Sequence, residues 1–180
     1  MSILSQTLPS TDEEHKKQNM KRIEANDPSA MCKAGLEQYS KGNYRKAFHN
    51  YTKSAELGEA EAHYQLAHLY HDGLGVEKNV GKEIYHLEEA AIGGHPTARH
   101  NLGAIEWNNN RNLDRAVKHW IIAATLGFDD STKLLMDTFK DGNISKEILT
   151  ATLHAYQTAV NATKSPQRSE ADIYFRENKR

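Results

Sequence analysis

The sequence predicts an all-α fold, an α-solenoid of helix-turn-helix repeats wound into a right-handed superhelix. One pattern of bulky residues, small residues and glycine recurs in three segments of the chain. Its positions are separated by three, four and seven residues, which places them on one face of an α-helix. Only 38% of the residues are hydrophobic and the mean hydropathy is -0.78, which suits an elongated stack of units better than a compact globule.

Each copy of the pattern combines a bulky residue, a small pair and a terminal glycine on one helix with two apolar positions on the next. The bulky residues are Tyr51, Leu87 and Trp120, and the small pairs are Ser54-Ala55, Ala90-Ala91 and Ala123-Ala124. The glycines are Gly58, Gly94 and Gly127, and the next helix carries Ala62, Ala98 and Ser131, each followed four residues later by Leu66, Leu102 and Leu135. An earlier partial copy consists of Ala30, Ala34-Gly35 and Tyr39. The shared face predicts that two helix axes approach closely at the small pair.

Proline, asparagine and glycine mark the predicted helix ends. Asp27-Pro28 and His95-Pro96 place proline in a first turn, and Asn43, Asn79 and Asn112 are predicted amino-terminal caps. The three pattern glycines predict left-handed caps at helix ends. The predicted helices span residues 28–40, 43–57, 60–71, 80–93, 96–107, 112–126, 129–140 and 145–163.

The connection at residues 71–78 is the longest within a repeat. Its two glycines, Gly73 and Gly75, permit a wide turn, and Val76 is expected to fold back onto the core.

Both ends of the repeat array have their own expected elements. Residues 11–25 predict a charged helix, in which Thr11 and Glu14 have capping-box spacing. The last long helix carries an apolar stripe of Leu149, Leu153, Tyr156 and Val160, with His154, Gln157 and Asn161 facing water. After Ser165-Pro166 we expect a short polar helix through Tyr174 and Phe175. The expected division is a charged linker helix at 1–27, the repeats with a capping helix pair at 28–163, and a polar tail at 164–180.

The second segment resembles the Sel-one-like repeat, a relative of the tetratricopeptide repeat with a longer loop that contains glycine. The matching positions are Ala62, Leu66-Ala67, Tyr70, Gly73, Gly75-Val76, Lys82, Glu89-Ala90-Ala91 and Gly94. The third segment, from Ala98 to Gly103, resembles the same motif with its loop shortened. The resemblance covers residues 28–163 and implies a scaffold that assembles protein complexes, with members linked to ubiquitin-dependent quality control and to signalling. It implies no active site.

The chain is also similar to a group of algal proteins in which a RING-type zinc module often precedes such repeats. The similarity is carried by Thr11-Asp12-Glu13-Glu14, by residues 22–28 and by residues 162–168. A single cysteine, Cys32, cannot build a zinc module of that kind. Ligase activity therefore does not carry over from the resemblance to these residues.

Charge and cysteine content narrow the classes of function. The 23 Lys and Arg residues nearly balance the 24 Asp and Glu residues, so we expect no broad field that attracts nucleic acid. One cysteine fits a reducing compartment, and no signal peptide or membrane span is expected. These observations predict a cytoplasmic, or alternatively nuclear, protein.

The sequence predicts no enzyme, no cofactor and no metal. No recognisable catalytic setting surrounds Ser40, Ser54 or Cys32. His68 and His71 lie three residues apart beside Asp72, but no third ligand is fixed by the sequence. A metal-dependent enzyme therefore remains only the weakest of the alternatives.

The predicted function is a protein-interaction scaffold that binds a peptide or protein on its concave face. In stacked helical pairs the first helix of each repeat lines that face. Its non-core positions, which we predict to bind the partner, are Tyr64, Gln65, His68, Asn101, Ala104 and Trp107. Tyr51, Tyr70, Tyr85 and Trp120 are expected mostly in the core, whereas Tyr64 and Trp107 are expected as exposed anchors. The alternative is the substrate-recognition part of a RING-type ubiquitin ligase; the oligomeric state is left open.

Overall fold

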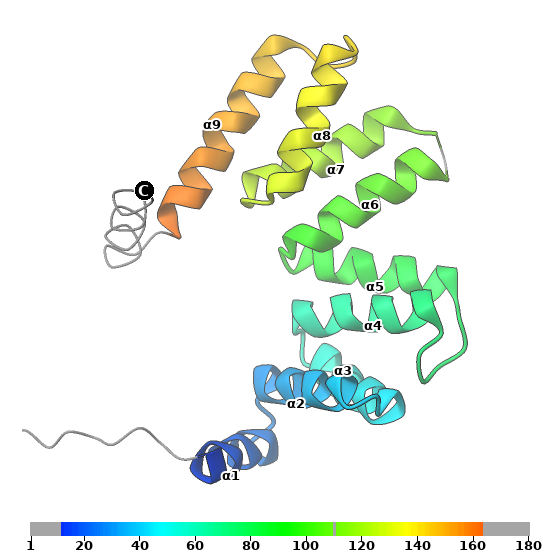
Figure 1. Cartoon of the computed structure of the whole chain (residues 1–180), viewed down its shortest axis with the longest axis vertical. Helices are drawn as coiled ribbons and strands as arrows, with labels where there is room; N and C mark the ends of the chain where they lie inside the picture. The colour runs from blue at the N-terminus through cyan, green and yellow to red at the C-terminus, as the bar shows by residue number, and fades with distance from the viewer. Residues whose placement is uncertain (1–11, 110, 164–180) are drawn as a thin grey trace, which may run out of the picture. The chain divides into compact units, whose positions relative to one another are not determined.

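A computed structural model describes residues 12–109 and 111–163, which form nine α-helices and no strand (Figure 1). The helices are α1 (Asp12–Glu24), α2 (Pro28–Ser40), α3 (Tyr44–Glu56), α4 (Ala60–Asp72), α5 (Val80–Ile92), α6 (Pro96–Asn108), α7 (Leu113–Thr125), α8 (Asp129–Lys140) and α9 (Lys146–Ala162). The predicted all-α repeat fold is confirmed, and each helix predicted within the described residues forms within one residue of its expected bounds. The expected helix after Ser165 and the capping box at Thr11 lie outside the described residues.

The helices group into two compact units, residues 1–86 and 87–180, with the boundary inside α5. In the first unit α2 packs against α1 and α3, and α3 packs against α4. In the second unit α6 packs against α7, α7 against α8, and α9 against both α7 and α8. The right-handed superhelix and the division at residues 27 and 163 stay predictions. No helix in the described part of the chain combines the length and the apolar character needed to span a membrane.

The positions of the recurring pattern, which form the seam between packed helices, are buried as predicted. The bulky residues Tyr51, Leu87 and Trp120 and all three small pairs lie in the core, together with the first-helix positions Ala62, Ala98 and Ser131. Ser54 sits in this apolar seam because its hydroxyl donates a hydrogen bond to the carbonyl oxygen of Pro28, at 2.6 Å. Its polar group is therefore satisfied without water.

Glycine in a first helix makes room for an aromatic ring from the second helix of the same repeat. A Cβ atom added to Gly35 would lie 2.5 Å from the ring of Tyr51, and one added to Gly103 would lie 2.5 Å from Nε1 of Trp120. Both distances are too short for any side chain, so these positions accept only glycine while the rings stay in place. At the equivalent positions the middle repeat has Ala67 and Leu87, a larger first-helix residue with a smaller bulky one.

Side-chain caps begin five of the described helices. The capping residues are Asp27, Asn79, His95, Asn112 and Ser145, each accepting a hydrogen bond from the backbone N–H three residues later. The cap predicted at Asn43 is wrong in its chemistry. Asn43 stands at the N-cap of α3, but its amide donates to Oε1 of Gln38 at 3.1 Å and caps no backbone group. At the other ends, the three pattern glycines have the predicted positive φ.

The long connection between α4 and α5 returns to the core of the first unit. Leu74 and Val76 are half-buried against the cluster around Tyr51, which confirms the expected position of Val76. Between them Gly75 has a φ of +73°, and an added Cβ would lie 2.7 Å from the backbone of Tyr44. Glycine is required here both by the backbone conformation and by the close approach of α3.

Tyr85 was grouped with the aromatic residues expected mostly in the core, and for this residue the expectation is wrong. Its side chain is 53% exposed, whereas Tyr51, Tyr70 and Trp120 are buried as predicted. The reason is helix geometry: Tyr85 precedes the buried Leu87 by two residues, and such residues point to opposite faces of a helix.

The apolar stripe of α9 covers α7 and α8 only partly. Leu149, Leu153, Tyr156 and Val160 are half-buried, and Leu149 packs against the core around Trp120. Thr152 is the one fully buried side chain of this helix. His154, Gln157 and Asn161 are exposed, as predicted.

Candidate functional site

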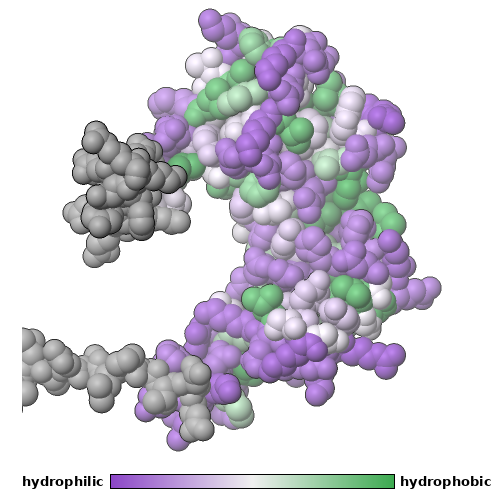
Figure 2. Space-filling model, viewed as in Figure 1, coloured by the Kyte–Doolittle hydropathy of each residue, from purple (hydrophilic) through white to green (hydrophobic). Residues whose placement is uncertain are grey.

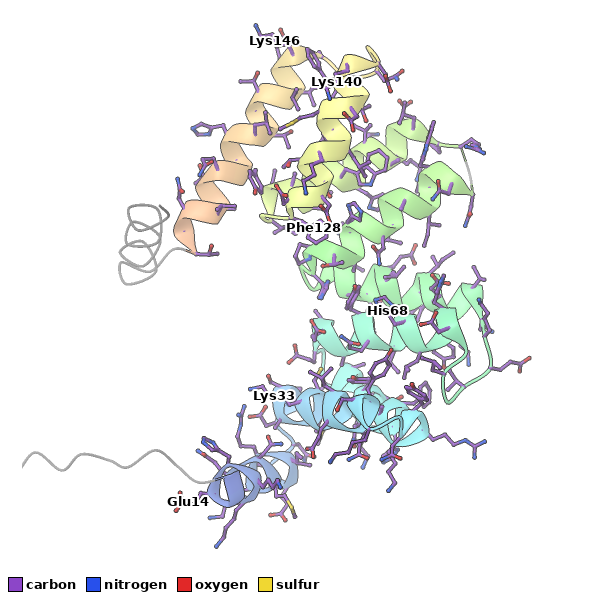
Figure 3. All side chains as sticks on the ribbon, viewed as in Figure 1. Glu14, Lys33, His68, Phe128, Lys140 and Lys146 are labelled. Atoms are coloured by element: carbon purple, nitrogen blue, oxygen red, sulfur yellow. The ribbon has the colours of Figure 1, made fainter. Side chains whose placement is uncertain are left out.

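Two grooves lie between the first helices of successive repeats, one within each unit. The first groove, between α2 and α4, has a volume of about 180 Å³. It is lined by Ser29, Cys32, Lys33, Leu36, Glu59, Glu61 and Gln65. Figure 3 labels Lys33 on α2, at one edge of this groove.

The first groove offers an exposed leucine and a cysteine that is not activated. Leu36 is 54% exposed on α2, although it is a large apolar side chain. Cys32 is buried, and burial together with the carboxylates of Glu61 and Glu59 raises the pKa of its thiol to about 12. At neutral pH this group is a thiol and not the reactive thiolate, so it contributes only apolar contact.

The second groove lies between α6 and α8, with two residues of α7 at its base. Its volume is about 380 Å³. It is lined by Ala104, Trp107, Asn108, Leu113, Trp120, Leu134, Asp137, Thr138, Asp141 and Asn143. Figure 2 shows that polar side chains cover most of the visible surface, with apolar residues in separate patches. An apolar groove with an exposed tryptophan is therefore a local feature of this surface.

Charged side chains of both signs lie in or next to the second groove. Trp107 is 39% exposed, and the guanidinium of Arg111, in the turn between α6 and α7, lies 6.0 Å from its ring centroid. Asp137 on α8 and Asp141, which directly follows this helix, supply carboxylates. Asp137 forms an ion pair with Lys140, which Figure 3 labels near the end of α8, with Nζ 2.7 Å from Oδ1. Asp141 forms no ion pair with any residue in the described ranges.

The two grooves use the same positions of the repeat. Gln65 and Leu134 each follow the small residue of the first helix by three places. Leu36, Ala104 and Asp137 follow it by six. Because these spacings keep residues on one helix face, the same face of the first helix lines a groove in each unit.

The structure places three of the six predicted binding residues in these grooves. Gln65 lines the first groove, and Ala104 and Trp107 line the second. Tyr64, His68 and Asn101 are half-buried on the same helices but line neither groove. Binding by these six residues stays a prediction. The three on α4 belong to the first unit and the three on α6 to the second.

Tyr64 and His68 pack against each other, with ring centroids 4.6 Å apart and planes perpendicular. Burial lowers the pKa of His68, so the imidazole is neutral at physiological pH. The pair therefore presents an uncharged aromatic surface on α4.

The sequence-based prediction missed Leu36, Leu134, Asp137 and Asp141. Leu36 was detectable, because it occupies the same repeat position as His68 and Ala104. The α8 residues were missed because this helix was expected only to cap the array. Its contribution depends on the side chains of α6 that lie opposite, which no local pattern in α8 specifies.

Several histidines connect α4 to α5. His71 Nδ1 lies 2.9 Å from Glu83 Oε1, and no group of three His, Cys, Asp or Glu in those ranges is placed to hold a metal ion. The Nδ1 atoms of His63 and His86 lie 3.0 Å apart, joining α4 to α5. His86 also stacks on Tyr70, with ring centroids 5.6 Å apart. Burial first, then His63 and Lys82, lowers the pKa of His86 to about 4.

Comparison with known proteins agrees with this repeat geometry. The model of the Sel1 repeat family matches residues 28–59, 60–95 and 98–128, which together make up more than half of the chain. No curated protein matches the sequence.

Two solved structures share the fold. One is a Sel1 repeat protein from Oxalobacter formigenes, 22% identical with a TM-score of 0.66, and the match covers 84% of this chain and 64% of that one. The other is c5321, a protective antigen present in uropathogenic Escherichia coli strains that displays an SLR fold. It is 21% identical with a TM-score of 0.60, and the match covers 94% of this chain and 37% of that one. The three consecutive repeat matches, in register with the helix pairs, establish that the chain belongs to the Sel1 repeat family.

Proposed function

We propose that this chain is a protein-interaction scaffold that binds a segment of a partner protein in the grooves between its first helices. Sel1 repeat proteins generally mediate protein–protein interaction. The main support for binding in these grooves comes from the second groove. There the exposed ring of Trp107 lies among apolar side chains with carboxylates alongside. Tryptophan is enriched among residues that dominate binding energy, because it buries a large area and has few rotatable bonds to order.

The repetition of the groove supports the same proposal. Equivalent positions line a groove in each unit, and apolar residues occupy several of them although they are accessible to solvent. Leu36 in the first groove and Trp107 in the second are the most exposed of these large apolar side chains. A scaffold that binds extended segments needs such repeated, partly apolar sites along its first helices.

The direct test is selection of peptides from a display library on the purified chain, followed by affinity measurements on variants. Trp107→Ala should weaken binding of the selected peptides at least about tenfold, as truncation of a central aromatic anchor does. Ile122→Ala is the matched control, because Ile122 is similarly exposed at 41% but lies on α7 outside both grooves. Its affinity should remain within about twofold of the wild type. If Trp107→Ala binds the peptides as well as Ile122→Ala does, the groove is not the binding site.

Substrate recognition within a RING-type ubiquitin ligase is the second candidate, and it rests on the similarity to the algal proteins with such modules. The zinc module would have to come from outside these 180 residues, because they contain one cysteine. This candidate predicts that ubiquitination of the groove-bound protein in cells decreases in Trp107→Ala and not in Ile122→Ala. Equal ubiquitination in both variants would contradict the ligase candidate and leave the protein-interaction scaffold as the proposed function.

A further inference from the structure

We infer that the second groove is the docking site of the chain's own residues 172–176, a segment that a partner must displace. The inference deepens the proposed function, because it names an occupant for the same groove. Residues 172–176 follow the described part of the chain and read Asp172-Ile173-Tyr174-Phe175-Arg176.

The groove combines an apolar surface with carboxylates in its lining and a guanidinium next to its tryptophan. Trp107, Leu113 and Leu134 provide the apolar surface. The guanidinium of Arg111 stands over the tryptophan ring, on the turn that joins α6 to α7. Asp137, on α8, and Asp141, directly after this helix, line the same groove. A matching ligand therefore combines apolar side chains with an acidic group and a basic group.

Residues 172–176 contain all three kinds of group. Asp172 is the acidic residue, Ile173, Tyr174 and Phe175 are the apolar run, and Arg176 is the basic residue. Asp172 would face Arg111, and Arg176 would face Asp141, whose carboxylate forms no ion pair with the described residues. Such a match of charges fixes the direction in which a segment binds.

The chain is long enough for this contact within one molecule. Asn143, at the groove, precedes the start of α9 by three residues, and the 17 residues of α9 extend roughly 25 Å. Thr163 follows this helix, and the 11 residues from there to Tyr174 can span roughly 36 Å when extended. The segment can therefore return along α9 to the groove.

The other end of the chain lacks the required chemistry. Residues 1–11 include Ile3, Leu4 and Leu8, but they contain no aromatic and no charged side chain. They could fill an apolar space, but they offer no charged side chain to pair with Arg111 or with Asp141. The charge pattern of the groove thus selects residues 172–176.

The test uses the full chain with 5-fluorotryptophan and a nitroxide label. The two tryptophans, Trp107 and Trp120, both line the groove, so both fluorine resonances report on it. Asn178→Cys places the label close to the proposed segment. Cys32 is 7% exposed and its thiol pKa is about 12, so it stays unlabelled. Docking predicts that the label broadens the Trp107 resonance several-fold more than it does in the matched variant Tyr174→Ser/Phe175→Ser.

Equal broadening in the two proteins would overturn the inference, because the tether is the same and only the anchor differs. Charge exchange sharpens the result: Asp141→Lys should reduce the broadening, and addition of Arg176→Asp should restore it. If a fluorine-labelled chain mixed with a spin-labelled, fluorine-free chain shows broadening of the same strength, the segment docks between copies and the intramolecular form is wrong.

The same variants separate this inference from the proposed function. Tyr174→Ser/Phe175→Ser should bind the selected peptides several-fold more tightly than the wild type, because no internal segment competes. Peptide binding that depends on Trp107 but not on Tyr174 and Phe175 would overturn the inference and leave the scaffold. Tail docking without any selected peptide would overturn the scaffold and leave the inference.

Discussion

At the scale of single residues, the packing of an aromatic ring against a glycine determines which residue the position accepts. Gly35 accepts the ring of Tyr51, and Gly103 accepts that of Trp120, at distances that leave no space for a methyl group. Alanine favours helix more strongly than glycine does, so local propensity alone would disfavour glycine at these positions. Packing between helices therefore outweighs the propensity of the individual helix.

Gly103→Ala tests this fit. The added methyl group must displace Trp120, so we expect a loss of about 1 to 3 kcal/mol in the free energy of unfolding, measured by urea denaturation. Gly81→Ala is the control, because its Cβ would meet only Oδ1 of Asn79, at 3.4 Å, near the start of α5. The control should be as stable as the wild type or slightly more stable. An unchanged midpoint for Gly103→Ala would mean that the ring can move at no cost.

At the scale of elements, the ends of the helices show which local sequence signals were sufficient to predict helix bounds. The bounds were predictable because proline, capping side chains and terminal glycines act within a few residues of one another. Asn43 shows where this fails, since a nearby glutamine side chain binds its amide instead. The aromatic side chain of Tyr85 suggests a core position, but its place on the helix face leaves it exposed.

Asp27→Ala should lower the midpoint of chemical denaturation, because it removes an N-cap side chain. Asp27 accepts a hydrogen bond from the N–H of Ala30 at 3.1 Å and pairs with Arg22 at 2.7 Å. Asn43→Ala provides the comparison, because that side chain caps no backbone group. Its cost should be smaller, and equal costs for the two variants would contradict the assignment of the caps.

Acid should weaken the packing of α4 with α5. Burial, together with His63 and Lys82, lowers the pKa of His86 to about 4, whereas an exposed histidine in the unfolded chain titrates near 6.5. Between about pH 6.5 and 4 the unfolded chain therefore binds more protons, so this contribution to stability is complete above pH 6.5 and is lost as the pH falls. Because His86 is only half-buried, the loss is on the order of 1 kcal/mol.

The measurement is the melting temperature from pH 7.5 to 4 for the wild type and His86→Gln. The variant should lose less stability across this range, with a remaining slope from other half-buried histidines. These are His68, His100 and His119, whose pKa values burial also lowers. His154→Gln, at an exposed position on α9, should follow the wild-type curve. A wild-type curve for His86→Gln would exclude His86 as a source of the acid sensitivity.

At the scale of the whole molecule, stability in repeat proteins is approximately a sum over units and their neighbours. Ala124→Glu places an unpaired charge in the fully buried seam of α7, at a cost on the order of 3 kcal/mol or more. Hydrogen exchange should then increase most in peptides from α6, α7 and α8, and less in those from α2 and α3. Ala151→Glu, at an exposed position of α9, is the control and should leave exchange unchanged. Wild-type exchange in Ala124→Glu would contradict the assignment of the seam.

The fold of the whole chain was predictable to a greater extent than its candidate site. Repetition shows the seam three times over, so chance matches are easily excluded. The second groove depends instead on two helices that are distant in sequence, and its acidic side comes from Asp137 and Asp141 in the last repeat-like pair. Trp107 could be identified because it is a large apolar residue outside the core positions. In the sequence, the two aspartates look like the charged residues of any solvent-exposed helix.

The match between glycine and ring also constrains how such an array can lengthen during evolution. A crossover that joined α4 to α7 would place Ala67 where Trp120 requires glycine, and one that joined α2 to α5 would leave Leu87 too small for the space beside Gly35. Recombination within a repeat would thus yield a strained or a hollow hybrid, whereas duplication of complete helix pairs keeps each ring with its own glycine. New copies should therefore arise in phase, with both helices inherited together.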